Sequence, residues 1–433
     1  MKRETLIFPA ENISAEKLLN WASRHDVFTL LNSNSATNNP KDKYSNFDLL
    51  LAIDPIEIYI EEDLFSVLRK ISGAKDWFIL HLSYDLKNKI EALSSTNPDQ
   101  INFPEFIIYR PALVFEIKDS ILSVHYISEN YSQEDIRYFV SRINEGAPEK
   151  LNSDYEIQIS ERLSRNEYIS EINEIKQHIQ RGDIYEMNYC QEFYSENATI
   201  DPCQTYLDLN EISPMPFSVF SRYNEHYLMC ASPERYLAKR GRKIISQPIK
   251  GTARRDPDHS IDLEIAGKLF HDEKERSENV MIVDLVRNDL SRTAEKGTVN
   301  VEELFAIKTF VQLHQMISTV TSVLHERNGL SDLIRTTFPM GSMTGAPKIM
   351  AMEIIEVTER TKRGLYSGSV GYLSPSGDLD LNVVIRSILY NEREKYLSFS
   401  VGSAITIGAS AEKEYDECLL KADAMKKVLS KKY

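Results

Sequence analysis

Cysteine is scarce in this sequence, and no two cysteines stand close enough to act as a pair. Only four occur in 433 residues: Cys190, Cys203, Cys230 and Cys418. Cysteines this sparse and scattered exclude a disulfide framework and a CxxC zinc site. We therefore expect reduced thiols and a cytoplasmic location.

Long hydrophobic runs and an excess of positive charge are also missing. No uncharged apolar stretch reaches about 18 residues, and Met1 to Ile7 contain no signal-peptide core, so we expect neither a transmembrane helix nor a secretory leader. The 51 Lys and Arg residues are outnumbered by 65 Asp and Glu residues, giving a net charge of -14. Nucleic acid and anionic membranes need a basic face, so neither is expected as the main partner, whereas a small anionic substrate remains compatible.

The composition supports a large folded core, with 42% hydrophobic and 27% charged residues. The pattern of the sequence divides the chain into residues 1–155, where short apolar runs alternate with polar loops, and residues 156–433, where periodic segments are denser. A polar connection over 145–160 joins them. Strand-like and helix-like segments follow one another irregularly, which favours a mixed antiparallel α/β (α+β) architecture over a doubly wound parallel sheet. We find no internal repeat and no low-complexity tract.

Hydrophobic periodicity predicts individual elements. The spacing of Tyr168, Ile172 and Ile175 predicts a helix over 165–181 that ends at Gly182. Further helices are expected at about 260–291, 302–307, 346–358 and 411–430. Strands are expected at 27–31, 47–53, 112–117, 217–220, 227–230, 243–249, 368–373, 383–390 and 396–407. Polar stretches at 32–42 and 94–100 are expected to be loops.

Two pairs of glutamates have the spacing of one helix face. Glu275 and Glu278 are three residues apart, as are Glu414 and Glu417. Like charges so placed repel, and two such pairs meeting in space would offer oxygen ligands suited to Mg²⁺. The alternative is that both pairs are solvated helix faces of an acidic protein.

Lys250 stands in the segment Pro248-Ile249-Lys250-Gly251-Thr252, which is typical of a strand end that runs into a turn. An amine desolvated in a pocket there would lose proton affinity and become a nucleophile. A surface lysine at the end of a strand is the alternative.

Other candidates are less specific when taken singly. The segment from Gly341 to Lys348 (GSMTGAPK) could bind an anion before a helix, or it is an ordinary tight turn; it lacks the features of a Walker loop. Arg386 interrupts an apolar run, so it grips a substrate carboxylate or forms an internal salt bridge. Lys421 holds a carboxylate or is solvated, and His314 lies among apolar residues where a satisfied core histidine is common.

Taken together and in this order, the segments resemble the chorismate-utilising enzyme family. The matching segments are Ser232 to Arg235, Pro248 to Thr252, Glu275 to Leu290 (ERSENVMIVDLVRNDL), His314, Gly341 to Lys348, Gly368 to Arg386 and Gly402 to Lys421. The resemblance covers about 165–433 strongly. It implies a single large β-sandwich with flanking helices, in which residues 1–155 support a catalytic core formed by 156–433.

The resemblance also implies roles for particular residues. Glu278 and Glu417 match direct Mg²⁺ ligands, and Glu275 and Glu414 match carboxylates that hold the waters of the metal. Glu234 matches a general acid/base, and His314 matches a histidine beside the departing ring hydroxyl. The expected substrate-binding positions are Tyr366, Arg386, Gly402 and Lys421, with Thr252 and Gly345 from the matching motifs.

Within the family, the position of Lys250 separates two chemistries. Anthranilate synthases typically have Ala there, whereas the intact PIKGT motif resembles the aminodeoxychorismate synthase branch. That branch aminates chorismate to 4-amino-4-deoxychorismate, on the way to p-aminobenzoate and folate. The implied mechanism has Lys250 attack carbon 2 and displace the 4-hydroxyl, after which ammonia attacks carbon 4 and expels Lys250. Anthranilate synthase component I is the alternative; isochorismate and salicylate synthases lack PIKGT and deliver water.

The ammonia source is expected to lie on another chain. No GxCxG nucleophile elbow is present, so we expect a separate glutamine amidotransferase subunit. Leu30-Leu31-Asn32-Ser33 replaces the Leu-Leu-Glu-Ser signature of tryptophan-inhibited relatives, which argues against inhibition by tryptophan. A non-catalytic sensor or scaffold is the alternative from another class, and the full set of site residues argues against it.

Overall fold

The computed structural model describes residues 2–35, 42–146 and 157–430. All strand pairs in this part of the chain are antiparallel, and twenty strands form one continuous hydrogen-bonded network. The expected antiparallel α/β class is therefore confirmed. None of the helices in the described ranges is long and apolar enough to cross a membrane.

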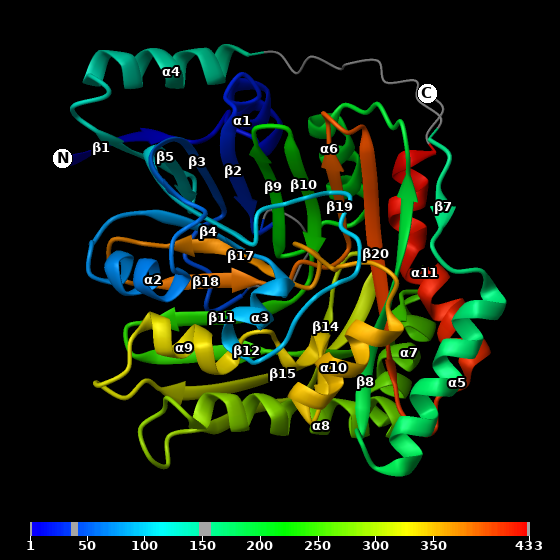
Figure 1. Ribbon diagram of the computed structural model, residues 1–433. Coiled ribbons are helices and arrows are strands. Elements are labelled where there is room, and N and C mark those ends of the chain that lie inside the picture. Colours follow the sequence, from blue (N-terminus) through cyan, green and yellow to red (C-terminus); the bar gives the residue numbers. More distant parts are fainter. Residues whose placement is uncertain (1, 36–41, 147–156, 431–433) are drawn as a thin grey trace.

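The network divides into two sheets. The first sheet runs in the order β1 (Arg3–Pro9), β6 (Ile121–Ile127), β5 (Phe106–Lys118), β3 (Leu49–Tyr59), β2 (Val27–Asn32), β9 (Phe217–Tyr223), β10 (His226–Ser232), β19 (Ser387–Asn391), β20 (Tyr396–Ile405) and β8 (Glu186–Ser195), with β7 (Ser160–Glu161) and β16 (Gly345–Ala346) on the outer edge of β8. The second sheet runs β4 (Phe78–Leu82), β17 (Ser369–Leu373), β18 (Leu379–Asn382), β11 (Arg235–Arg240), β12 (Lys243–Gln247) and β15 (Leu313–Val323), with β13 (Ile249–Arg254) and β14 (Asn300–Thr309) also on β15. In Figure 1 the strands of the second sheet cross the view, whereas β8, β10 and β20 run up and down it.

The long strand β5 joins the two sheets. Its first residues pair with β4 and its last residues pair with β6, while β3 lies along its other side. Strand β2 pairs with β9, and β4 pairs with β17, so strands from the first 120 residues are built into sheets formed by the rest of the chain. The division into units 1–155 and 156–433 stays a prediction, and most of the expected connection at 145–160 lies outside the described residues.

Alternating side chains of the first sheet separate two hydrophobic cores. Leu50 and Ala52 of β3 belong to the core between the sheets, whereas Leu51 and Ile53 belong to the core on the outer face. The inner core continues under α2 (Leu64–Ser72), α8 (Glu273–Ser291) and α9 (Leu330–Thr337). The outer core is covered by α1 (Ala15–Ala22), α4 (Gln133–Glu145), α5 (Arg165–Arg181), α6 (Pro202–Ile212), α10 (Lys348–Thr358) and α11 (Ala411–Leu429). These two packed layers form the expected sandwich with flanking helices.

Most predicted elements are confirmed, and two are wrong. The helix at 165–181 is α5, capped by Ser164 with a capping box and ended by Gly182 at φ 86°. The expected helix at 302–307 is instead part of β14, where register shifts and a positive φ at Phe305 disturb the two-residue alternation. The expected strand at 383–390 begins only at Ser387. The helix expected at about 260–291 is divided at Asp272 into α7 (His259–His271) and α8, and the described part of the chain also has the short helix α3 (Lys87–Ile90). Of the loop expected at 32–42, residues 36–41 lie outside the described part.

Candidate active site

Lys250 lies on β13 and meets a carboxylate from the other sheet. Its Nζ donates a hydrogen bond of 2.6 Å to Oε1 of Glu186, the first residue of β8. The side chain of Lys250 is 10% exposed and that of Glu186 is 1% exposed, so the ion pair is buried. The second oxygen of Glu186, Oε2, has no hydrogen-bond partner among the described residues. The structure thus rejects the alternative of a solvated lysine.

The charges around Lys250 raise the pKa of its amine. Burial by itself lowers this pKa, but the nearby carboxylates of Glu186, Glu278 and Glu234 outweigh it. Desolvation acts on Lys250 as expected, but the carboxylates reverse its effect, so the expected net loss of proton affinity is not found. A nucleophilic Lys250 needs a neighbouring group to accept its proton, and Glu186 is in hydrogen-bond contact to do so.

Glu234 is a buried acid close to the two cationic side chains of Lys250 and Arg386. It precedes β11, and its backbone oxygen accepts a hydrogen bond from the N–H of Val383. Burial raises the pKa of Glu234 from 4.5 to about 7, partly offset by the charges of Lys250 and Arg386. Glu234 can therefore hold a proton near neutral pH, as a general acid must.

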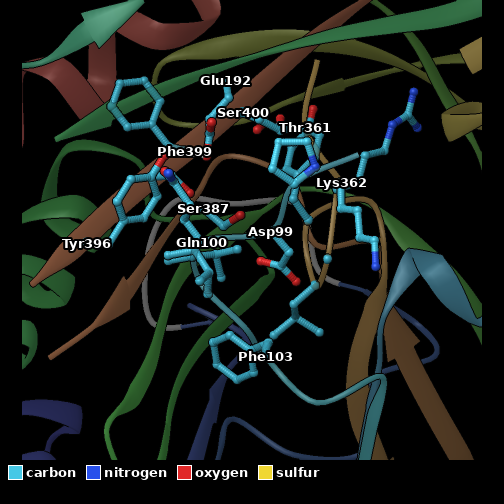
Figure 2. Close-up of a pocket in the computed structure, with 18 residues that line it drawn as sticks. Asp99, Gln100, Phe103, Glu192, Thr361, Lys362, Ser387, Tyr396, Phe399 and Ser400 are labelled. Carbon is cyan, nitrogen blue, oxygen red and sulfur yellow. Dashed lines mark hydrogen bonds between the residues drawn. The ribbon is translucent and has the colours of Figure 1, made fainter. Parts of the chain in front are cut away.

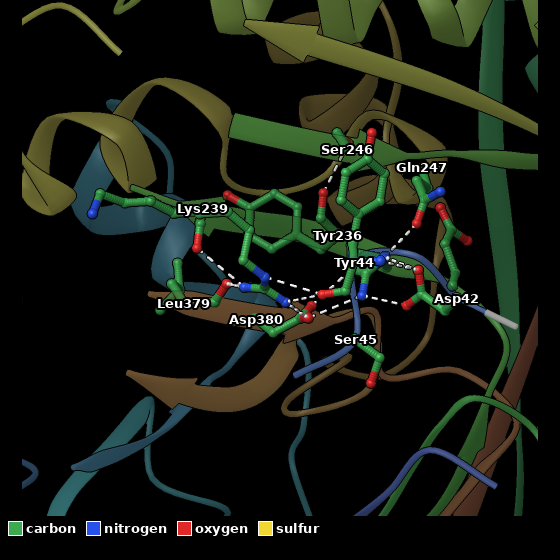
Figure 3. A network of polar contacts seen from close by, with 12 residues as sticks. Asp42, Tyr44, Ser45, Tyr236, Lys239, Ser246, Gln247, Leu379 and Asp380 are labelled. Atoms are coloured by element: carbon green, nitrogen blue, oxygen red, sulfur yellow. Dashed lines mark hydrogen bonds and ion pairs between the residues drawn. The ribbon is translucent and has the colours of Figure 1, made fainter. Parts of the chain in front are cut away.

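The segment around Glu234 is fixed by a polar network on its next residue (Figure 3). The fully buried guanidinium of Arg235 donates bonds of 2.8 and 2.9 Å to the two oxygens of Asp380. Further bonds reach Asp42, at 2.6 Å, and Oε1 of Gln247, at 2.5 Å. This network ties β11, β12 and β18 to the segment at Asp42, and it restricts where Glu234 can point.

Arg386 stands in a break between β18 and β19, not inside a strand. Its backbone is left-handed, with φ 49°, and burial lowers the pKa of its guanidinium to about 10. No hydrogen bond or ion pair from this guanidinium to another described residue is found within 4 Å, and Glu234 is the acid whose charge acts on it. The structure therefore does not support the alternative of an internal salt bridge. An enclosed cation without a partner is suited to an incoming carboxylate.

The two glutamate pairs meet in space. Glu275 and Glu278 lie on α8, and Glu414 and Glu417 lie on α11. Lys274 bridges the helices, with Nζ 3.1 Å from Glu414 and 3.7 Å from Glu278. Glu278 and Glu414 are buried, and burial raises the pKa of Glu278 to about 7. The alternative of solvated helix faces therefore fails for these two residues.

This acidic cluster has oxygen atoms suited to a divalent cation. Oε1 of Glu278 and Oε2 of Glu186 are buried without a hydrogen-bond partner among the described residues. In that part of the chain no three acidic, His or Cys side chains are close enough to hold a metal by themselves. Mg²⁺ usually takes only one or two protein carboxylates and completes its shell with waters and substrate, so the residues fit this ion.

Lys421, Gly402 and Tyr366 form a second side of the site. Nζ of Lys421 donates bonds of 2.9 Å to the backbone oxygen of Gly402 and 2.8 Å to Glu417. Gly402 pairs with Cys190 across β20 and β8, and a Cβ at Gly402 would lie 2.6 Å from Sγ of Cys190. The same sulfur contacts the Tyr366 hydroxyl at 3.8 Å. The structure thus brings these candidates together, and only glycine fits at position 402.

Gly345 acts through packing. It pairs with Met187 beside Glu186, where an added Cβ would collide with the Glu186 backbone oxygen. The lysine of the same motif, Lys348, bonds to Asp289 at 2.5 Å and to two backbone oxygens, so it anchors α10. Thr252 is exposed on β13. The segment from Gly341 to Lys348 is therefore a turn that supports β8.

His314 is not brought to the Lys250 cluster. Its Nε2 lies 2.9 Å from Oδ1 of Asp262, and its Nδ1 lies 2.9 Å from the Thr309 hydroxyl. Arg255 holds the same aspartate at 2.8 Å. Both ring nitrogens are occupied, as in the satisfied core histidine considered above. The next residue, Gln315, faces the opposite side of β15, is 1% exposed, and its Oε1 lacks a partner among the described residues.

Three further residues carry no sequence signal of their own. Glu186, Lys274 and Gln315 become functional candidates only through their contacts or their unpaired buried atoms. Glu186 begins β8 (EMNYCQEFYS), whose sequence holds a second acid, Glu192, and two amides, so no local pattern draws attention to it.

A narrow cavity that Tyr366 helps to line is drawn in Figure 2, where Ser387 and Tyr396 are labelled. Its lining includes Tyr366, Ser387 and Tyr396. The space within it is about 20 Å³, enough for a water-sized molecule and far too small for a substituted ring. This cavity is therefore too small to take a ring-sized ligand.

Comparison with known proteins agrees with this arrangement. Residues 21–427 match the family described as chorismate binding enzyme. Aminodeoxychorismate synthase component 1 of Escherichia coli (strain K12) is 35% identical over 353 residues, covering 80% of this chain and 76% of that protein. Anthranilate synthase component 1 of Thermus thermophilus is 31% identical over 357 residues, covering 81% and 76%. The crystal structure of anthranilate synthase component I from Streptococcus pneumoniae TIGR4 shares the fold, with a TM-score of 0.78 at 24% identity and coverage of 91% and 95%.

Proposed function

The chain belongs to the family of chorismate binding enzymes, and on that premise we propose that it aminates chorismate to 4-amino-4-deoxychorismate. The observation that carries this choice is the buried Lys250, paired with Glu186 at 2.6 Å in the centre of the carboxylate cluster. Several relatives at 30–40% identity are named aminodeoxychorismate synthase component 1, which supports the same choice. The product would feed p-aminobenzoate and folate synthesis.

Chorismate is a dianion, and the site offers separate groups for its two carboxylates. The unpaired guanidinium of Arg386 is suited to one carboxylate, and Lys421 supplies positive charge near Gly402. Glu278 and Glu417 would hold Mg²⁺, with Glu275 and Glu414 around its waters. The ion would neutralise and position a substrate carboxylate in this acidic surrounding.

The protein side chains account for the proton movements of the proposed reaction. Glu186 takes the proton from the Lys250 ammonium, and the free amine attacks carbon 2 of the ring. The double bonds shift, the 4-hydroxyl departs, and Glu234 gives it the proton that makes it water. Ammonia then attacks carbon 4, the double bonds shift back, and the bond between Lys250 and carbon 2 breaks.

The ammonia is proposed to come from a separate glutamine amidotransferase. The name component 1 of the relatives implies a second component, and this chain lacks a glutaminase nucleophile motif. We further propose that the enzyme works in the cytoplasm, which the four free cysteines support.

The decisive experiment is a product assay with the purified chain, chorismate, Mg²⁺ and ammonium chloride. The expected product is 4-amino-4-deoxychorismate, which an added lyase converts to p-aminobenzoate. Fluorescent anthranilate in its place would overturn the proposal in favour of anthranilate synthase. The Lys250→Ala variant should form no product while remaining folded, and mass spectrometry of the wild-type protein with chorismate alone should find an adduct on Lys250.

A further inference from the structure

A second cavity lies in the N-terminal part of the fold and shares no residue with the Lys250 site. Its volume is about 210 Å³, roughly ten times that of the cavity that Tyr366 helps to line. It is enclosed by the end of α1, the middle of β3 and one face of α4. This space accommodates a single small ring with substituents.

Aromatic side chains form the walls of this cavity. Trp21 is 7% exposed, and its ring lies 5.3 Å from that of Phe139. Phe139 in turn contacts the rings of Tyr131 at 5.7 Å and Tyr138 at 6.2 Å. Trp21, Phe139 and Tyr131 support one another and offer planar surfaces for a stacked ring, whereas Tyr138 is 62% exposed and lies at the rim.

The acid in this cavity is already engaged. Asp54 accepts a hydrogen bond of 2.7 Å from Nδ1 of His25 and another from the Tyr131 hydroxyl. These bonds lower the pKa of Asp54 although burial raises it. Asp54 therefore stays ionised and has little capacity left to attract a cationic ligand.

Two arginines at the same cavity are nearly free. In the described part of the chain the guanidinium of Arg24 has no recorded partner, and Arg142 has only an exposed ion pair with Glu145 at 3.8 Å. Asp26, two residues after Arg24, is paired with Arg222 at 3.3 Å. The cavity lining contains two arginines, Arg24 and Arg142, and one aspartate, Asp54, so it is cationic in a chain whose net charge is -14. Such a local reversal of sign favours an anion.

We propose that this cavity binds a small planar aromatic carboxylate. The ring of the ligand stacks among Trp21, Phe139 and Tyr131, and its carboxylate accepts hydrogen bonds from Arg24 and Arg142. This binding is separate from catalysis, and it holds whether or not the proposed reaction is correct.

Binding can be tested with 4-fluorobenzoate, observed by fluorine NMR on the whole chain. We expect saturable line broadening, and weaker binding by roughly five- to tenfold in Arg24→Gln and in Arg142→Gln, because each removes a charged hydrogen bond. Arg137→Gln, on the same helix but outside the lining, is the matched control and should bind as the wild type does. Arg386→Gln removes the carboxylate grip of the catalytic site and should also leave this binding unchanged.

A second readout reports the place of binding. The chain has two tryptophans, and Trp77 lies in the inner core, so Trp77→Phe leaves Trp21 as the single fluorophore. The same ligand should quench this fluorescence with the same affinity, whereas the cation 4-fluorobenzylamine should not. Absence of broadening in the wild type, or loss of binding only in Arg386→Gln, would overturn the inference.

Discussion

Lys250 and Glu186 come from different sheets, and their side chains meet at 2.6 Å in a buried ion pair. The pair links β13 of one sheet to β8 of the other beside the carboxylate cluster. In a buried ion pair the attraction between the partners offsets the cost of taking both charges out of water, and removal of one partner leaves an unpaired buried charge. The proposed nucleophile is therefore also part of the structure that holds the site together.

This dual role predicts different results for single and double substitutions. Lys250→Met should lower the free energy of unfolding by about 3 kcal/mol, because it leaves Glu186 charged and buried. The double variant Lys250→Met/Glu186→Gln should recover most of this loss, yet remain inactive. Denaturant unfolding and the product assay measure the two effects separately. Equal stability of single and double variants would contradict the pairing.

Glu234 should make the protein less stable as the pH rises. Its pKa is about 7 in the folded protein and 4.5 ordinarily, so between these values the folded form keeps a proton that the unfolded chain has lost. Stability therefore falls across this window, by about 3 kcal/mol in total, and levels off above pH 7. Glu234→Gln cannot ionise, so its advantage over the wild type should grow from pH 4.5 to pH 7.

Thermal melting at pH 5 and pH 8 measures this effect of Glu234. The exposed Glu11→Gln loses the same charge and serves as the control. If the difference in melting temperature between Glu234→Gln and the wild type is the same at both pH values, Glu234 does not titrate in this range.

Removing the charge of Arg386 should weaken substrate binding without loss of stability, whereas removing the charge of Arg363 should destabilise the fold. Arg386→Gln should raise the KM for chorismate by roughly tenfold or more, since a charged hydrogen bond to the substrate is lost, while the melting temperature stays the same or rises. Arg363 is buried with Glu359 at 2.6 Å, so Arg363→Gln should destabilise the fold by about 3 kcal/mol. Steady-state kinetics and melting curves distinguish the two. A strongly destabilised Arg386→Gln would mean that Arg386 has a structural partner.

Lys274 should compete with a divalent cation for the acidic cluster. Its ammonium lies between Glu278 and Glu414, so Lys274→Gln leaves the buried carboxylates without this counter-charge. Without metal the variant should melt at a lower temperature than the wild type, and Mg²⁺ should raise its melting temperature by the larger amount. Lys268→Gln, whose partner Glu264 is exposed, is the control. An equal Mg²⁺ effect in all three proteins would place the ion elsewhere.

The sequence allowed prediction of those features that depend on short spacing. The helix α5 was predicted from its apolar period and its terminal glycine, and both are confirmed; the structure adds the Ser164 cap. The glutamate pairs were predictable because each pair lies within one helical turn. The strand β14 was misread because its bulges change the alternation locally, which gives Val301, Leu304 and Phe305 a helix-like spacing.

Features that depend on distant pairing could not be predicted in this way. Glu186 becomes the partner of Lys250 only because β8 and β13 are brought together from 64 positions apart in the chain. The orientation of His314 toward Asp262, and of Gln315 toward the other face, depends on which side of β15 α7 covers. Neither fact is encoded in the spacing of neighbouring residues.

The pairing of early strands with late ones has a consequence for how the protein is made. Strands β2 and β4 leave the ribosome early, but their partners β9 and β17 are synthesised about 190 and 290 residues later, so those edges stay open during much of translation. Exposed strand edges of this kind attract other chains. Soluble yield in a cell should therefore depend more on translation speed and on chaperones that shield nascent chains than on the final stability of the enzyme.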